Sequence, residues 1–366
     1  MENTTELFFE FDEDTNSYTV IGKMSEDVTE IVIPDTYDGL PVTKIADYAF
    51  EEDSDCVERI VLGGNVEVVG EDAFRWCYEL KSITFGSSVK HIGDNALPLK
   101  SMDINYLGTI EDWCGISYGF SEAGKEIALY INGEILKNAV IPSTVKEINN
   151  CAFDGCKYLE SVTIENGVTK IGQYAFFNCT SLKRIIIPIS VETMGERVFD
   201  GCSFIEIFME TEDFEPKNWD SSWCDADDEK LIFGYNGKDV GTTQDGIKYA
   251  ETKSGIAIYG DIKDENASLP TMINGKEVTT LAGVELESIK HLDIPSNISI
   301  LSKLGISCSS LESVYIHRGV KKVGRCAFFG CDSLSTIYCE ADERPDDWDE
   351  QWNCYSEARV IWGYKK

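Results

Sequence analysis

Residues 182–202 read LKRIIIPISVETMGERVFDGC, which is one complete copy of a unit that recurs along the chain. Ile185 and Ile187 are two residues apart, which is the period of a strand, so both should face inward. Pro188 ends the strand because it has no N–H to donate. Gly195 then provides a turn, and the pair at 198–199 begins a compact helical or irregular segment that packs under the sheet. We therefore predict that each unit forms one coil with a strand on one side.

The spacing of the units is nearly constant. An Ala-Phe or Val-Phe pair, followed three residues later by Cys, places its aromatic residue at Phe74, Phe153, Phe176, Phe199 and Phe328. The three central ones, Phe153, Phe176 and Phe199, are 23 residues apart. A fixed period of this length predicts a solenoid, in which each coil buries its apolar face against its neighbours. One later coil departs from the pattern, with Leu304-Gly305 in place of the pair.

A longer repetition predicts how the ends of the coil runs are covered. Residues 208–235 resemble residues 337–364, since each block holds two tryptophans and ends in LIFGY or VIWGY. The opening at 9–21 and 37–43 likewise resembles residues 249–259 and 273–279. Because a solenoid needs its apolar ends covered, we interpret these blocks as Trp-containing caps and hairpin-like amino-terminal caps.

The caps divide the chain into two predicted domains. Residues 1–240 would hold an amino-terminal cap, the repeats and a Trp cap, and residues 241–366 a shorter repeat unit with its own caps, docked on the first. The join at 234–246 is polar and rich in glycine, like a linker. An insert at 98–140 breaks the period and contains a predicted hairpin turning at Asn132-Gly133. Trp113 in this insert either folds back on the coils as a brace or belongs to a projecting contact loop.

The charge of the chain restricts its partners. Asp and Glu number 65 against 32 Lys and Arg, which leaves a formal net charge of −33. Such a surface repels phosphate backbones and anionic lipids, so we expect no nucleic acid partner. No run of about 18 apolar residues predicts membrane insertion. The first residues, MENTTELFFEFDEDT, lack the pattern of a signal peptide, and no anchor is visible, so the sequence leaves the compartment open.

Thirteen cysteines raise the question of disulfides or metal. Six of them occupy the same slot of successive coils, namely Cys77, Cys156, Cys179, Cys202, Cys308 and Cys331. A buried free Cys behaves as a small apolar residue and suits a narrow turn. The odd total and the absence of CxxC pairs argue against a disulfide framework or a zinc site, so we predict a structural ladder.

Units of the form LxxIxIPxxVxxIGxxAFxxC resemble the leucine-rich repeats of the BspA-like surface-protein family, found in bacteria and some parasitic protozoa. The insert with IEDWC and the paired-Trp blocks are also similar to segments of family members from gut Firmicutes. The resemblance implies an α/β leucine-rich-repeat solenoid, rich in β structure, with a parallel sheet on one face and short helical or irregular segments on the other. For some members it implies adhesion to host matrix proteins or to other bacteria, and hence a cell-surface or secreted location.

The sequence gives little support to catalysis. Its three histidines, His91, His291 and His317, occupy unrelated repeat positions, and no nucleophile, zinc-protease or nucleotide-binding motif is present. The stretch beginning at Asp12 starts like a calcium loop but has Ser17 where Gly is required. We therefore expect no enzyme, no cofactor and no metal site. Weak collection of cations by the acidic residues of 342–350 is the exception that we keep open.

Binding is the predicted role, and two sets of residues are the candidates. Between the inward residues of four strands, outward positions hold Thr84, Thr163, Ile186 and Tyr315. An aromatic edge would consist of Trp76, Phe177 and Phe329, which either form an exposed contact stripe or shield neighbouring coils. We expect a non-catalytic module that binds a protein or a glycan. The alternative is a structural or assembly protein with an acidic, weakly cation-binding surface, and the oligomeric state stays open.

Overall fold

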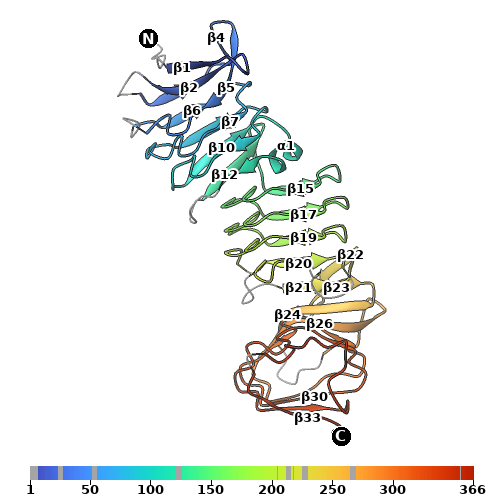
Figure 1. Ribbon diagram of the computed structural model, residues 1–366. Coiled ribbons are helices and arrows are strands. Elements are labelled where there is room, and N and C mark those ends of the chain that lie inside the picture. The colour runs from blue at the N-terminus through green and yellow to red at the C-terminus, as the bar shows by residue number, and fades with distance from the viewer. Residues whose placement is uncertain are drawn as a thin grey trace. The chain divides into compact units, whose positions relative to one another are not determined.

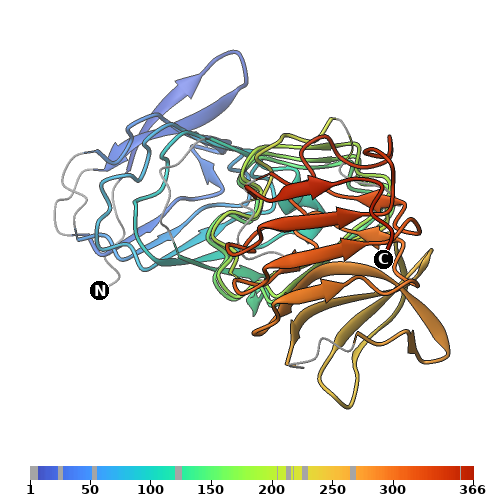
Figure 2. The same ribbon diagram turned by 90° about the horizontal axis from the view of Figure 1, so that it is seen from below.

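The computed structural model describes residues 7–23, 28–51, 56–119, 126–203, 205–211, 216, 218–224, 230–263, 269–354 and 356–366 (Figures 1 and 2). The chain forms two compact units. The first unit comprises Met1–Ser203 and Asn218–Asp225, and the second comprises Phe204–Lys217 and Ala226–Lys366. The two-domain division at residue 240, with the second domain docked on the first, stays a prediction.

In the first unit, one series of parallel strands follows the Ile-x-Ile motifs of the sequence. Ile185 and Ile187 are fully buried, as the alternation predicts. The strands of this series, in two sheets, are β3 (Glu30–Val32), β6 (Arg59–Val61), β8 (Ser82–Phe85), β10 (Met102–Tyr106) and β12 (Ile127–Ile131), then β14 (Asn138–Ile141), β16 (Ser161–Ile164) and β18 (Arg184–Ile187). The antiparallel strand β13 (Glu134–Ile135) pairs with β12 and turns at Asn132-Gly133, so the predicted hairpin is confirmed.

A second series of very short parallel strands was not predicted from the sequence. It lies where a simple turn was expected, and in most units it comes directly before a glycine. Figure 1 shows three of its members, β15, β17 and β19, as parallel rungs. The strands are β7 (Val68–Val69), β9 (His91–Ile92) and β11 (Ser117–Tyr118), which follow β5 (Leu40–Ile45), and β15 (Glu147–Ile148), β17 (Lys170–Ile171) and β19 (Thr193–Met194).

The glycine that follows most of these short strands is required by close packing and not by a turn conformation, although Asn149 occupies this place after β15. A Cβ on Gly195 would lie 2.3 Å from the backbone nitrogen of Gln173 in the preceding coil, which no side chain tolerates. The left-handed turn comes two residues later, at Arg197, where φ is 51°. The same conformation recurs at Tyr174 and Cys151, with φ of 57° at both. The interpretation of Gly195 as a permissive turn residue is therefore wrong.

The Phe residues build a stacked spine inside the coils. Phe176 lies between Phe153 and Phe199, with ring centroids 5.2 and 5.6 Å away and nearly parallel planes. The segments that contain them are hydrogen-bonded turns, and the one α-helix among the described residues is α1 (Ile110–Cys114). The fold is therefore a β-solenoid with almost no helix, and the helical part of the predicted α/β description is not found.

Free cysteines form the predicted ladder beside this spine. The thiols of Cys179 and Cys202 donate to the carbonyl oxygens of Phe153 and Phe176, at 3.0 and 3.1 Å. All six cysteines of the shared slot are buried, and none of them forms a disulfide. Burial raises the pKa of the Cys331 thiol to about 12, which keeps it protonated and unreactive near neutral pH.

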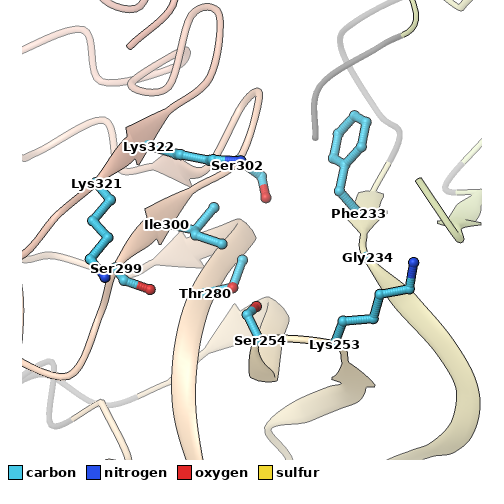
Figure 3. Close-up of a pocket in the computed structure, with 10 residues that line it drawn as sticks. All are labelled: Phe233, Gly234, Lys253, Ser254, Thr280, Ser299, Ile300, Ser302, Lys321 and Lys322. Atoms are coloured by element: carbon cyan, nitrogen blue, oxygen red, sulfur yellow. The ribbon is translucent and has the colours of Figure 1, made fainter. Parts of the chain in front are cut away.

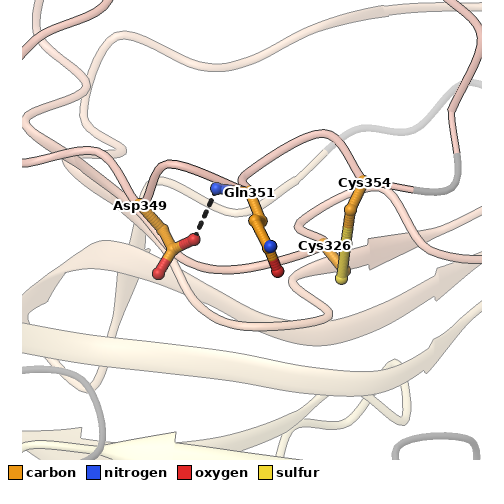
Figure 4. Close-up of a disulfide and its surroundings, with 4 residues drawn as sticks. All are labelled: Cys326, Asp349, Gln351 and Cys354. Atoms are coloured by element: carbon orange, nitrogen blue, oxygen red, sulfur yellow. Dashed lines mark hydrogen bonds between the residues drawn. A yellow bond between two sulfur atoms is a disulfide. The ribbon is translucent and has the colours of Figure 1, made fainter. Parts of the chain in front are cut away.

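One disulfide runs against the expectation from the cysteine spacing. It joins Cys326 to Cys354 near the end of the second unit, where the Cα atoms are 4.9 Å apart (Figure 4). The turn between them is held by a hydrogen bond from the Gln351 backbone nitrogen to the Asp349 carboxylate at 2.7 Å. Neither cysteine belongs to the ladder slot, which explains why the repeat pattern gave no signal for the pair.

The two predicted pairs of tryptophans pack with matching geometry, while their role as caps stays a prediction. In the first unit, the indole nitrogen of Trp219 donates to Val191 O at 3.3 Å, and its ring lies 5.2 Å from that of Trp223. Trp348 in the second unit donates to Val320 O, also at 3.3 Å. Within the insert, Trp113 is 2% exposed and donates to Ala152 O at 2.7 Å. It is therefore a brace and does not belong to a projecting loop.

Each unit also contains an antiparallel hairpin next to a parallel strand. In the first unit these are β1 (Leu7–Asp12), β2 (Ser17–Lys23) and β5, with β4 (Thr36–Tyr37) paired to β5. In the second unit they are β23 (Lys248–Thr252), β24 (Gly255–Ile262) and β26 (Lys276–Leu286), with β25 (Met272–Ile273) paired to β26 and β22 (Tyr235–Thr242) to β23.

The coils of the second unit repeat the two series of strands (Figure 2). The longer strands are β27 (His291–Asp293), β30 (Ser313–Ile316), β32 (Thr336–Cys339) and β33 (Arg359–Ile361). The short strands that pair with β26 are β28 (Ile300–Leu301) and β29 (Ile306–Ser307), and β31 (Lys322–Val323) follows β28. A further parallel pair consists of β20 (Glu206–Met209) and β21 (Lys230–Phe233).

Candidate binding surfaces

The outward positions of the longer strands lie where the alternation places them. Thr163 is exposed, and Thr84, Ile186 and Tyr315 are half-buried, while the residues on either side of each are buried. The structure brings Thr163 and Ile186 together as neighbours in register on β16 and β18. Thr84 belongs to a different sheet of the first unit, and Tyr315 belongs to the second unit. Of the four residues, the strand pairing therefore brings together only Thr163 and Ile186.

The row through β14, β16 and β18 is apolar and open. Val140, the neighbour of Thr163 on β14, is 55% exposed, and Ile186 completes the row. Ile189, just beyond the end of β18, is 53% exposed. These three aliphatic side chains give the first unit a β-branched patch that no sequence consideration beyond Ile186 had singled out. We call Val140, Thr163 and Ile186 the outward row.

Tyr315 is already bonded within the second unit. Its hydroxyl donates to Glu340 Oε1 at 2.6 Å, and this hydrogen bond raises the pKa of Tyr315 to about 12. The ring of Tyr364 lies 6.0 Å from that of Tyr315 and 4.6 Å from that of Tyr338. The ammonium group of Lys366 lies 5.3 Å from the Tyr315 ring centroid. Tyr315 thus takes part in a packed aromatic cluster.

The aromatic edge residues are all half-buried, and two have defined ring contacts. The ring of Trp76 lies 6.2 Å from that of Tyr48, and the Arg75 guanidinium lies 5.7 Å from its centroid. The Phe177 ring lies 5.5 Å from that of Tyr174, with the Arg197 guanidinium over both rings. Phe329 belongs to the second unit. These contacts favour shielding of neighbouring coils for Trp76 and Phe177.

A pocket of about 400 Å³ in the second unit was not predicted from the sequence. Its walls come from the end of β21, the turn between β23 and β24, and the strands β26, β28 and β31 (Figure 3). Its lining residues are Phe233, Gly234, Lys253, Ser254, Thr280, Ser299, Ile300, Ser302, Lys321 and Lys322. The one sequence signal nearby was the missing Ala-Phe pair at Leu304-Gly305, which marked this coil as irregular.

Histidines and carboxylates do not assemble a reactive centre in the described residues. His291 Nδ1 pairs with Ser313 Oγ at 2.8 Å, and His317 Nε2 with Pro295 O at 2.8 Å. No group of three or more His, Cys, Asp or Glu in the described ranges has the geometry to hold a metal ion. Over those same ranges, no helix is long and apolar enough to cross a membrane.

Comparisons with known proteins agree with the repeat pattern. The family model of the BspA type leucine rich repeat region matches in 6 copies over residues 24–114, 128–215 and 271–343, which is more than half of the chain. No curated protein matches the sequence.

Several solved structures are similar. A leucine rich cell surface protein from Faecalibacterium prausnitzii A2-165 is 18% identical, with 99% of this chain and 94% of that chain covered and a TM-score of 0.40. A leucine-rich repeat protein from Bacteroides ovatus ATCC 8483 is 19% identical, with 98% of each chain covered and a TM-score of 0.38. The leucine rich repeat protein of T. pallidum is 20% identical, with 63% of this chain and 84% of that chain covered and a TM-score of 0.33. On the match to the repeat model, the chain belongs to the family of BspA type leucine rich repeat proteins.

Proposed function

We propose that the protein is a non-catalytic, adhesin-like binding module that takes a protein partner on the outward row of the first unit. The observation that carries this proposal is the aliphatic surface formed by exposed Val140 and half-buried Ile186 on the sheet of β14, β16 and β18. Exposed apolar side chains on a repeat scaffold support partner binding, because burying them releases water without any rearrangement of the coils. The net charge of −33 favours a partner with a basic surface, which it would attract at long range.

A binding assay with matched variants tests the outward row. Purified extracellular matrix proteins and acidic and neutral polysaccharides would be immobilised, and the full chain passed over each. We expect binding to a basic matrix protein that the double variant Val140→Lys, Ile186→Lys loses. The matched control is the pair Ile21→Lys, Val32→Lys, which introduces the same charge at 44% and 51% exposed positions on β2 and β3, in other sheets. Binding that survives the double variant would rule out the outward row, and binding to polysaccharides alone would make the ligand a glycan.

The family membership also supports a location at the cell surface, which we include in the proposal. Intact cells of the source organism would be treated with a membrane-impermeant labelling reagent. The proposal expects this protein to be tagged while a cytosolic marker stays unlabelled. If both proteins are protected equally, the module binds its partner inside the cell and the matrix proteins are the wrong probes.

A further inference from the structure

The pocket of the second unit lies on a face that has a direct counterpart in the first unit. In the first unit, Lys44, Val68 and His91 follow one another in register across β5, β7 and β9. In the second unit, the corresponding row across β26, β28 and β31 is Thr280, Ile300 and Lys322. The same backbone pairing therefore presents different side chains, and the differences can be assigned position by position.

The first difference removes an acidic residue. Lys90 in the first unit forms an ion pair with Glu67, with Nζ and Oε2 2.8 Å apart. The corresponding residues of the second unit are Lys321 and Ser299, and the backbone nitrogen of each Lys donates to the carbonyl of its counterpart at 2.8 Å. The lining of the pocket contains three lysines and no Asp or Glu. In a chain with twice as many acids as bases, this lining is a local positive region suited to an anion.

The second difference opens room for a hydroxyl. Gly70 follows the short strand β7, and a Cβ there would lie 2.5 Å from the backbone nitrogen of Asp47. Ser302 follows β28 at the same position. It is accommodated because β26 continues to Leu286 through Gly283, whose φ is 69°, whereas β5 ends at Ile45. The second half of β26 pairs with β29, in the coil that lacks the Ala-Phe pair.

Ser302 has a buried hydroxyl that no other group of the described residues satisfies. It is 1% exposed, it lines the pocket, and its Oγ has no hydrogen-bond partner among the described residues. A buried hydroxyl without a partner destabilises the folded chain by roughly 1–3 kcal/mol, so such groups are rare unless something else satisfies them. Figure 3 shows Ser302 and Ile300 on one wall of the pocket and the Phe233 ring on the other. A ligand between the walls would reach all three.

We propose that this pocket binds a small organic anion of the acidic-sugar class. Its carboxylate would be held by the ammonium groups of Lys321 and Lys322, and its hydroxyls by Ser302 and Ser254. The apolar face of its ring would lie between Phe233 and Ile300. The cavity of about 400 Å³ falls within the roughly 300–1,000 Å³ typical of small-molecule sites. This site is separate from the outward row and does not depend on the function proposed there.

Calorimetric titration of the full chain with D-glucuronate, D-glucose and inorganic phosphate tests the proposal. We expect glucuronate to bind at least about tenfold more tightly than either of the others, because only it offers both the charge and the ring. Glucose binding equally well would overturn the role of the lysines. Phosphate binding equally well would overturn the sugar, leaving a site for inorganic anions. Absence of glucuronate binding would overturn the proposal as a whole.

Two matched variants place the binding in the pocket. Ser299→Glu restores the acidic residue that the first unit has at this position, and we expect it to weaken glucuronate binding by about tenfold or more through repulsion and neutralisation of Lys321. Glu67→Ser makes the reverse change in the first unit and should leave binding unchanged. Thermal melts that match the unaltered chain show that both variants fold. Unchanged affinity in folded Ser299→Glu, or a loss in Glu67→Ser, would contradict the assignment of the site.

Discussion

The face formed by β5, β7 and β9 in the first unit and the face formed by β26, β28 and β31 in the second share one strand register and differ in chemistry. On the first face, Glu67 neutralises Lys90, and the backbone at Asp47 leaves no space for a side chain at position 70. On the second, Ser299 and Ser302 occupy these two positions, and a pocket follows. A regular coil thus closes its own surface, while a few departures in one coil accompany an open pocket.

The two ends of the coil runs show the opposite case, in which sequence repetition preserves geometry. Phe199 meets the ring of Trp223 edge-on at 5.9 Å, and Phe328 meets that of Trp352 at 6.1 Å. Only the second end adds a disulfide, from Cys326, where the first has Arg197 bonded to Asp200 at 2.6 Å. Apolar ends of a solenoid must be covered, so their packing is constrained in a way that an open face is not.

The largest expected effect tests the Phe spine of the regular coils. Phe176→Ala removes the middle ring of a fully buried stack and should lower the free energy of unfolding by roughly 3–5 kcal/mol. Chemical denaturation followed by tryptophan fluorescence measures the change. The control, Phe177→Ala, truncates a half-buried neighbour and should have a clearly smaller effect. Equal losses in the two variants would show that the spine does not organise the coils.

The disulfide between Cys326 and Cys354 is present beside the tryptophan pair of the second unit and has no counterpart, among the described residues, beside the pair of the first. Cys326→Ser should lower the stability of the second unit by about 2–4 kcal/mol, since the cross-link restricts the unfolded chain. Thermal melts would be recorded with and without a reducing agent. We expect reduction to destabilise the unaltered protein and to leave the variant unaffected. If the melting temperature of the unaltered protein is the same with and without the reducing agent, the disulfide does not contribute to the stability of the second unit.

Exchanging Gly70, which follows β7, and Ser302, which follows β28, tests whether the two faces differ in the space they leave for a side chain. Gly70→Ser forces a Cβ against the Asp47 backbone and should destabilise the first unit by about 1–3 kcal/mol. The reverse change, Ser302→Gly, removes the unpartnered buried hydroxyl and adds the backbone entropy cost of glycine, so it should destabilise the second unit by less than about 1 kcal/mol, if at all. Urea titrations measure both. Similar costs for the two exchanges would contradict the claim that Ser302 has room where Gly70 has none.

The smallest expected effect is a change in the pKa of Tyr315, an outward residue of the second unit. The hydrogen bond to Glu340 raises the pKa of Tyr315 from 10.0 to about 12, so its contribution to stability is present below pH 10 and is lost as the pH rises toward 12. Glu340→Gln should bring the pKa of Tyr315 back toward 10. Ultraviolet difference titration of the tyrosinates, compared between the two proteins, detects the shift. Identical titration curves would show that Tyr315 is not bonded to Glu340 in solution.

Much of the architecture was predictable from the sequence because the coil spacing and the Ile-x-Ile alternation are repeated. The inward Phe spine, the cysteine ladder, the hairpin at Asn132-Gly133 and the family all follow from that repetition. The short second series of strands was missed, since two-residue strands carry no alternation of their own. The close approach at Gly195 was also missed, because it depends on the distance between coils.

The candidate sites were harder to predict. Alternation placed Thr163 and Ile186 on one surface but gave no sign that Tyr315 is bonded to Glu340. The pocket depends on residues from Phe233 to Lys322, which no local pattern connects. Leu304-Gly305 was visible as a departure from the repeat, yet its consequence became clear only from the pairing of β26 with β29. Departures from a repeat are therefore the positions at which to search for function.

A crystal structure of the full chain grown with D-glucuronate tests the central claim most directly. The account predicts the sugar between Phe233 and Ile300, with its carboxylate at Lys321 or Lys322 and a hydroxyl bonded to Ser302 Oγ. It predicts no sugar on the corresponding face around Val68 and Lys90, where Glu67 balances the charge. A pocket that stays empty at saturating glucuronate, or a sugar bound equally on both faces, would contradict it.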